Sequence, residues 1–203
     1  MRHLILLTSL AVASCSSTDQ PNPDAAGQLD AAWASTTITL PDVPVSVAPF
    51  DVVHVDWKQP LGEAYVYLNH VGDYRLAGAR IAELFAEAQV QGAPLRGAPF
   101  LLFYDDPGKT PMNQLRARIC IGLATDFSSL PPLYMDQLEA RPVAYAAIGG
   151  AYSEVPRSYP GIFAYMAGRG WTPGTPIREI YLVSPAGVPA EQLVTEVQVP
   201  WGS

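Results

Sequence analysis

Two kinds of apolar spacing alternate along the chain after about residue 50. Short runs rich in Val, Ile, Leu and Tyr, bounded by Gly and Pro, predict strands: AYVYLNHVG, FLLFY, LRARICIGL, PVAYAAIGG, EIYLV and LVTEVQVPW. An apolar stripe at i, i+3, i+4 and i+7 predicts a helix facing a sheet, and it is made by Ile81, Leu84, Phe85 and Ala88. The pattern therefore indicates a mixed α+β domain.

The predicted elements occur twice at a constant offset. Residue types recur 78 positions apart without a gap, as in Tyr67 and Tyr145, Gly72 and Gly150, Phe85 and Phe163, and Gly92 and Gly170. Each unit reads strand, helix, strand, strand, over about 51–125 and 129–203 of a domain spanning 46–203. We expect a mostly antiparallel sheet with two helices and a central groove between the halves, where small-molecule pockets form.

The second helix is less regular than the first. Pro156 can begin it, but Pro160-Gly161 follows a turn later and predicts a kink or a restart, because proline lacks a backbone donor. The register also predicts that Phe85 and Phe163 occupy equivalent core positions.

The first residues predict export. Arg2, an apolar run and small residues before Cys15 have the layout of a signal peptide over 1–14, and Val12-Ala13-Ser14-Cys15 resembles a bacterial lipoprotein signal. The alternative is an ordinary signal with an incidental cysteine. We expect lipidation at Cys15, a flexible tether over 15–45 in which Trp33 suggests local docking, and a cell-envelope location on the outer membrane facing the periplasm.

Charge and composition narrow the chemistry. The chain has 203 residues, a net charge of −7 and a pI near 4.8, which fits one domain, expected to be a monomer, and argues against a nucleic-acid partner. Cys120 is expected to be a small buried hydrophobe rather than a nucleophile. Asp105-Asp106 before Pro-Gly predicts a turn, and His54 and His70 lack metal-ligand spacing, so no metal and no cofactor is expected.

The second copy resembles a known family. AYSEVP, IFAYM, GWTP, REIYLVSP and TEVQVP occur in order over about Phe50 to Trp201 and resemble the GyrI-like small-molecule-binding domain, the effector-binding domain of bacterial transcription activators. The resemblance implies a duplicated fold whose groove takes hydrophobic, often cationic, small molecules, with a carboxylate on the Glu-x-Tyr strand, here Glu179. Tyr165 stands where the family often has tryptophan, and no helix-turn-helix precedes the domain, so we expect a stand-alone lipoprotein.

The strand pattern independently places Glu179 at the groove. On an extended strand Glu179 and Tyr181 share one face, matching Leu101 and Phe103 of the first copy. With Tyr165 and Trp171 from the helix end, these six residues are the predicted ligand-binding set. The alternative is that Glu179 points to solvent or pairs with Arg178 or Arg169.

Three functions follow from this reading. The favoured one is membrane-tethered binding of a hydrophobic or cationic small molecule. The second is a hydrolase for reactive, cyclopropane-bearing compounds, a chemistry of some GyrI-like proteins, with Glu179 activating water. The third is a tetrapyrrole binder, because heme-binding proteins of the SOUL type share the duplicated architecture. Whether the protein is an enzyme is left open by the sequence.

Overall fold

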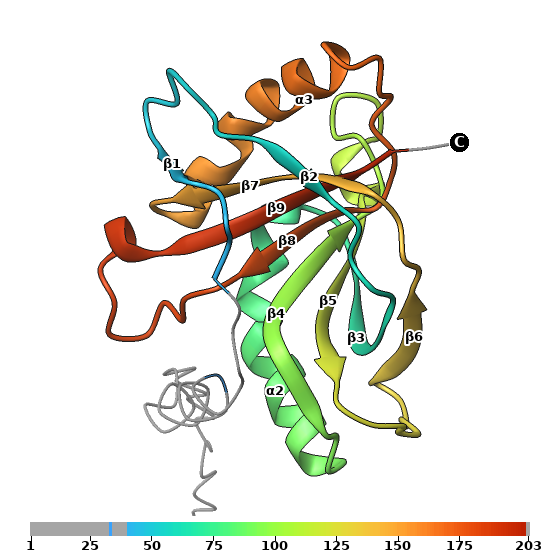
Figure 1. Cartoon of the computed structure of the whole chain (residues 1–203). Helices are drawn as coiled ribbons and strands as arrows, with labels where there is room; N and C mark the ends of the chain where they lie inside the picture. Colours follow the sequence, from blue (N-terminus) through green and yellow to red (C-terminus); the bar gives the residue numbers. More distant parts are fainter. Residues whose placement is uncertain (1–32, 34–39, 202–203) are drawn as a thin grey trace, which may run out of the picture.

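The computed structural model describes Trp33 and residues 40–201, in which one mixed sheet carries two α-helices (Figure 1). The elements run in the order β1 (Val45–Val47), β2 (Asp56–Lys58), β3 (Glu63–Val71), α2 (Ile81–Val90), β4 (Leu95–Phe103), β5 (Arg116–Leu123), β6 (Tyr134–Leu138), β7 (Val143–Gly149), α3 (Tyr159–Ala167), β8 (Ile177–Tyr181) and β9 (Val194–Pro200). The sheet has nine strands. No helix in this described part is long and apolar enough to cross a membrane.

The duplication predicted from the sequence is confirmed. The first copy is β3, α2, β4 and β5, and the second is β7, α3, β8 and β9. The strand order β1-β7-β9-β8-β4-β5-β3-β6 joins the copies through the antiparallel pair β4 and β8. At that junction Leu101 lies directly opposite Glu179, which is its own counterpart 78 residues later. The axis relating the two halves therefore passes between these two residues.

The turn after the first strand has the same backbone geometry in both copies. Gly72 and Gly150 have φ of 129° and 112°, a region that side chains with a Cβ rarely adopt. Their N–H groups donate to the equivalent carbonyls of Leu115 and Leu193, at 2.8 and 2.9 Å. The two copies therefore close this turn with the same backbone conformation and the same hydrogen bond.

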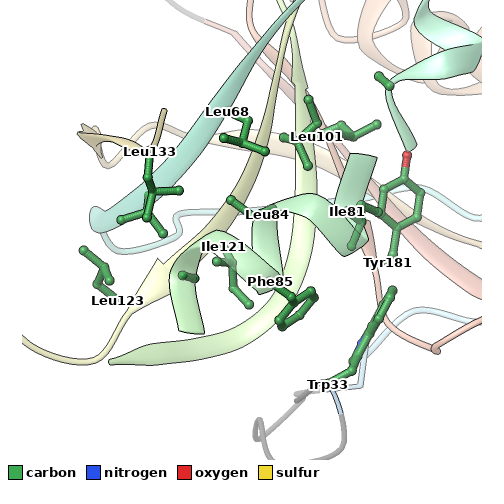
Figure 2. Close-up of a cluster of buried hydrophobic side chains, with 14 residues drawn as sticks. Trp33, Leu68, Ile81, Leu84, Phe85, Leu101, Ile121, Leu123, Leu133 and Tyr181 are labelled. Atoms are coloured by element: carbon green, nitrogen blue, oxygen red, sulfur yellow. The ribbon is translucent and has the colours of Figure 1, made fainter. Parts of the chain in front are cut away.

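Both helices cover the same face of the sheet. Residues paired across neighbouring strands share a face, and one such row crosses both copies: Leu68, Ile119, Leu101, Glu179, Val197 and Ala146. The first three belong to the apolar cluster under α2, which Figure 2 shows, and the last two to the cluster under α3. Glu179 lies between the two clusters, and it is the one charged residue of the row.

The irregular start of α3 follows its prolines. A 3₁₀ segment over Tyr152–Ser158 contains Pro156, and a new α-helix begins at Tyr159 with Pro160 in its first turn, where a missing N–H costs little. The predicted restart is thus confirmed. Phe163 is only partly buried, unlike Phe85, because Ile162 and Met166 supply the buried stripe of this helix.

The N-terminal region contributes one described residue to the core. Trp33 is 2% exposed and stacks on Phe85 with ring centroids 6.1 Å apart, near Tyr181 (Figure 2). This confirms the docking expected for Trp33. The predicted signal peptide, Cys15 and most of the predicted tether lie outside the described residues.

Three strands were not predicted. β1 and β2 add to β7, and β6 adds to β3. β2 and β6 are themselves counterparts 78 residues apart, and each pairs with the first strand of the other copy.

Candidate functional site

Glu179 is a buried carboxylate among hydroxyl groups. It is 6% exposed, and it accepts hydrogen bonds from the hydroxyls of Tyr159 and Tyr181, the latter at 3.1 Å. Within the described residues no Lys, Arg or His lies within ion-pair distance of it. Arg178 instead pairs with Glu63 on the opposite face, and Arg169 lies over Tyr165. The alternative of a solvated or arginine-paired Glu179 is therefore wrong.

Burial dominates the electrostatics of this cluster. Removal from water raises the pKa of Glu179 above its ordinary value, and the hydrogen bonds from Tyr159 and Tyr181 only partly oppose that rise. Burial, together with the neighbouring carboxylate, also raises the pKa values of both tyrosines. The site therefore holds an acid that is costly to ionise without a cation beside it.

Aromatic side chains line both sides of the junction in matching pairs. Tyr152 packs on Tyr181 with ring centroids 4.6 Å apart, and in the first copy Tyr74 packs on Phe103 at 4.7 Å. The hydroxyl of Tyr152 donates to the carbonyl of Val183 at 2.7 Å, so this ring is held in place.

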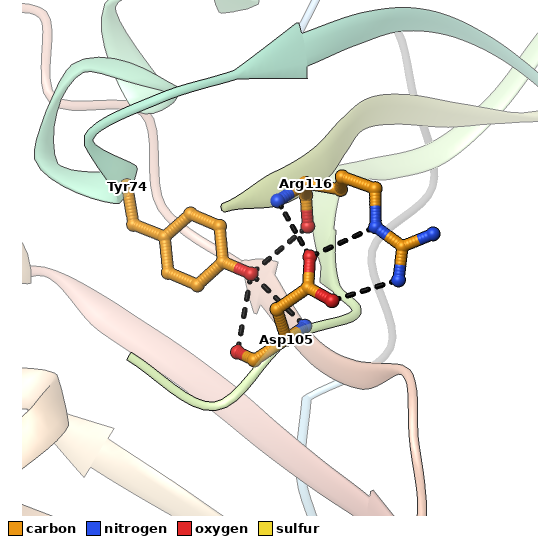
Figure 3. Close-up of polar contacts among 3 residues, drawn as sticks. All are labelled: Tyr74, Asp105 and Arg116. Atoms are coloured by element: carbon orange, nitrogen blue, oxygen red, sulfur yellow. Dashed lines mark hydrogen bonds and ion pairs between the residues drawn. The ribbon is translucent and has the colours of Figure 1, made fainter. Parts of the chain in front are cut away.

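Tyr74 occupies the equivalent position in the first copy, and its hydroxyl lies 3.2 Å from the carbonyl of Asp105, the counterpart of Val183. The hydroxyl of Tyr74 also lies 2.9 Å from the carbonyl of Arg116 and accepts from the N–H of Asp105 at 3.0 Å (Figure 3). The side chain of Asp105 closes the same network through an ion pair of 2.7 Å with Arg116. The predicted turn at Asp105-Asp106 is confirmed, because Asp106 accepts from the N–H of Gly108.

The structure brings together four of the six residues predicted for the site. Leu101 is buried opposite Glu179, Tyr181 donates to it, and Phe103 packs on the same apolar cluster. Tyr165 and Trp171 lie elsewhere, at the C-terminal end of α3, with ring centroids 6.1 Å apart. Trp171 stacks on Trp201 at 3.8 Å, so this pair belongs to a separate aromatic cluster.

The sequence reading missed Tyr159. It is the first residue of α3, and 78 positions earlier the first residue of α2 is Ile81. The first copy thus has Ile81, Leu101 and Phe103 where the second has Tyr159, Glu179 and Tyr181. A residue-by-residue comparison of the two copies could have found Tyr159. At all three positions an apolar residue of the first copy is replaced in the second copy by a residue with a polar group.

Cys120 and His70, two other residues considered for a chemical role, make structural contacts. Cys120 is fully buried, as expected, and burial raises the pKa of its thiol. A ring nitrogen of His70 lies 3.0 Å from the carbonyl of Asp73, and among the described residues no cluster of His, Cys, Asp and Glu could hold a metal ion.

This duplicated α+β domain matches a family of small-molecule-binding domains. The profile of the GyrI-like small-molecule-binding domain matches residues 64–201, and the chain belongs to this family. The EcmrR C-terminal domain is a similar solved structure, with 14% identity and a TM-score of 0.67 over 75% of this chain and 99% of that one.

Two further solved structures share the fold. EcmrR in a complex with DNA is 15% identical, with a TM-score of 0.66 over 73% of this chain, which spans 57% of that longer chain. A hydrolase from Listeria innocua is 12% identical, with a TM-score of 0.53 over 78% of this chain and all of that one. Among curated proteins no relative matches the chain.

Proposed function

We propose that this domain binds a hydrophobic small molecule carrying a positive charge, with Glu179 as the group that recognises the charge. The observation that carries the proposal is the buried Glu179 carboxylate, whose described partners are two tyrosine hydroxyls and no cation. Ionising a carboxylate that is buried among apolar residues costs free energy, and a cation bound beside the carboxylate offsets that cost.

The aromatic surroundings suit the apolar part of such a ligand. Tyr74, Phe103, Tyr152 and Tyr181 lie on either side of the junction, and rings near a cation add about 0.5–2 kcal/mol. The pairing of Leu101 with Glu179 across the axis makes the two sides of the junction unlike, and this asymmetry favours one orientation of the ligand.

Access requires movement at the start of α3. Glu179 is 6% exposed, and Tyr159, which covers it, belongs to the first turn of a helix that follows a 3₁₀ segment. We propose that a ligand displaces the Tyr159 hydroxyl and takes its place beside the carboxylate. A 3₁₀ segment has poorer hydrogen bonds than an α-helix, so this segment is where we expect the motion.

The test uses two ligands of nearly the same shape. Methyltriphenylphosphonium is a cation and triphenylphosphine oxide is neutral, and both are titrated calorimetrically into wild type and Glu179→Gln at one salt concentration. We expect Glu179→Gln to weaken binding of the cation by about 1–3 kcal/mol and to leave the binding free energy of the oxide nearly unchanged. Equal losses for both ligands, or no loss for the cation, contradict the role of Glu179.

A hydrolase is the second candidate, favoured by the raised pKa of Glu179 and the hydroxyl of Tyr159 beside it. A carboxyl group whose pKa lies closer to neutral exchanges a proton with water more effectively. One structure with this fold is of a hydrolase. Addition of one water to a cyclopropane-bearing compound, followed by mass spectrometry, separates turnover from binding, and Glu179→Gln is the matched control.

We also propose that the domain is tethered to the outer membrane through a lipid on Cys15. The support is the sequence Val12-Ala13-Ser14-Cys15 after an apolar run too short to span a bilayer. Such an anchor holds the binding domain in the periplasm, where lipophilic compounds pass.

A further inference from the structure

The face of the sheet that carries no helix holds a cavity of about 280 Å³. This volume lies just below the usual range for ligand pockets, about 300–1,000 Å³. Its lining includes Leu102 of β4. It also includes Pro60, from the segment between β2 and β3, and Arg141, from the segment between β6 and β7. Glu179 does not line it, because successive residues of a strand point to opposite faces.

Two arginines stand on the floor of this cavity in one row. Arg118 on β5 and Arg178 on β8 are both paired with Leu102, one on each side. Neighbouring strands are about 4.8 Å apart, so the backbones of these arginines are about 10 Å apart. Each guanidinium lies over an aromatic ring, Arg118 at 4.0 Å from the centroid of Tyr67 and Arg178 at 3.8 Å from that of Phe100. Stacking fixes the orientation of both groups.

Donor groups remain available on both arginines. Nη1 of Arg118 donates to Tyr65 and Asp136, at 2.6 Å each, and its other nitrogens make no hydrogen bond within the described chain. Nη2 of Arg178 donates to Glu63, while its Nε is buried without a partner among the described residues. A buried donor left unpaired costs free energy.

Each arginine of the cavity lining has a carboxylate partner: Asp136 for Arg118, Glu63 for Arg178 and Glu139 for Arg141. The cavity is therefore close to neutral, whereas the whole chain carries a net charge of −7. Apolar surface completes the lining, from Leu102, Leu138, Val143 and prolines, together with the ring of Tyr104. The cavity thus has apolar surface that can contact a flat ring of a ligand, next to arginines that can bind an anionic group of the same ligand.

We propose that this cavity is a second binding site, which takes a small aromatic carboxylate. The carboxylate accepts hydrogen bonds from Arg118 and Arg178, whose planar groups suit carboxylate geometry, and the ring packs on Leu102 and Tyr104. The proposal does not rest on the function of Glu179, which lies on the other face.

The probe is 2-naphthoate, with the neutral 2-naphthamide as its matched analogue, in calorimetric titrations of the full domain. We expect wild type to bind the acid at least about tenfold more tightly than the amide. Arg118→Gln lowers affinity for the acid by about tenfold or more and leaves that for the amide within about twofold. Arg75→Gln is the control, because Arg75 is exposed and pairs only with Asp73 in the described structure.

A second variant separates loss of binding from loss of the fold. Arg118→Gln alone leaves Asp136 unpaired, so Arg118→Gln/Asp136→Asn removes both charges, and circular dichroism shows whether the fold is kept. Both variants must lose the preference for the acid. The proposal is overturned if wild type does not bind 2-naphthoate at millimolar concentration, if either folded variant keeps that preference, or if Glu179→Gln abolishes naphthoate binding.

Discussion

Three substitutions remove the polar cluster at the junction while keeping its shape: Tyr159→Phe, Glu179→Leu and Tyr181→Phe. Two of the new residues are those of the first copy, where Leu101 and Phe103 occupy the equivalent positions. The carboxylate and both hydroxyls that donate to it disappear together, so no buried polar group is left behind. Replacing both partners of a buried interaction with apolar groups of the same shape is neutral or stabilising.

The expected gain can be worked out from the burial of Glu179. Well-packed apolar residues in place of buried charged groups often stabilise a protein by about 1–4 kcal/mol. Because the pKa of Glu179 is raised by burial, the folded protein holds this proton more tightly than the unfolded chain. Wild type therefore loses stability as pH rises from the ordinary carboxyl value through the folded pKa, by about 1.4 kcal/mol for each unit between them.

The assay is urea unfolding of wild type and the triple variant at several pH values from about 4 to 8. We expect the variant to be more stable by about 1–4 kcal/mol at pH 8, with the difference shrinking toward pH 4, and to have lost binding of methyltriphenylphosphonium. A variant that is less stable than wild type by more than about 1 kcal/mol at pH 8, or a difference that does not change with pH, refutes the reasoning.

Three other predictions concern packing and anchoring. Trp33→Ala should cost about 3–5 kcal/mol in urea unfolding, whereas the same change at Trp57, which is 53% exposed, should cost far less; similar losses at both sites count against docking of Trp33. Gly161→Ala places a Cβ 2.6 Å from a methyl and 2.8 Å from the Cβ of Val53, so we expect a loss of about 1–3 kcal/mol in the free energy of unfolding; Val53→Gly removes both contacting groups, so the loss in the double variant should be smaller than the sum of the single losses, and additive losses argue against the contact. Cys15→Ser should move the protein from the membrane fraction to the soluble fraction or leave an uncleaved precursor, and wild type found soluble and unlipidated rules out the anchor.

Local pattern was enough to predict the duplicated architecture. The offset of 78 residues carries the same glycine turns and the same strand faces, so the opposition of Leu101 and Glu179 follows from equivalence of the halves. The edge strands were missed for a physical reason. β1, β2 and β6 are short and largely exposed, and pairing with β7 and β3 rather than their own apolar content makes them strands.

The site was predicted only along its strands. Alternation in β4 and β8 places Leu101, Glu179 and Tyr181 on one face without knowledge of the fold. The helix contribution depends on the point at which α3 restarts, and that brings Tyr159 to Glu179. Tyr165, six residues later, is about 9 Å further along the helix axis, so it reaches Trp171 instead.

Arg178 and Glu179 are neighbours in β8, and their side chains leave the strand on opposite sides. The two proposed sites are thus separated by the thickness of one sheet. A bound anion and a bound cation about 10 Å apart, at an effective dielectric constant of about 20, attract each other by about 1.7 kcal/mol. By thermodynamic reciprocity each ligand tightens the other by the same factor, about 17-fold. On these two proposals, the domain binds each of the two oppositely charged molecules more tightly when the other is present.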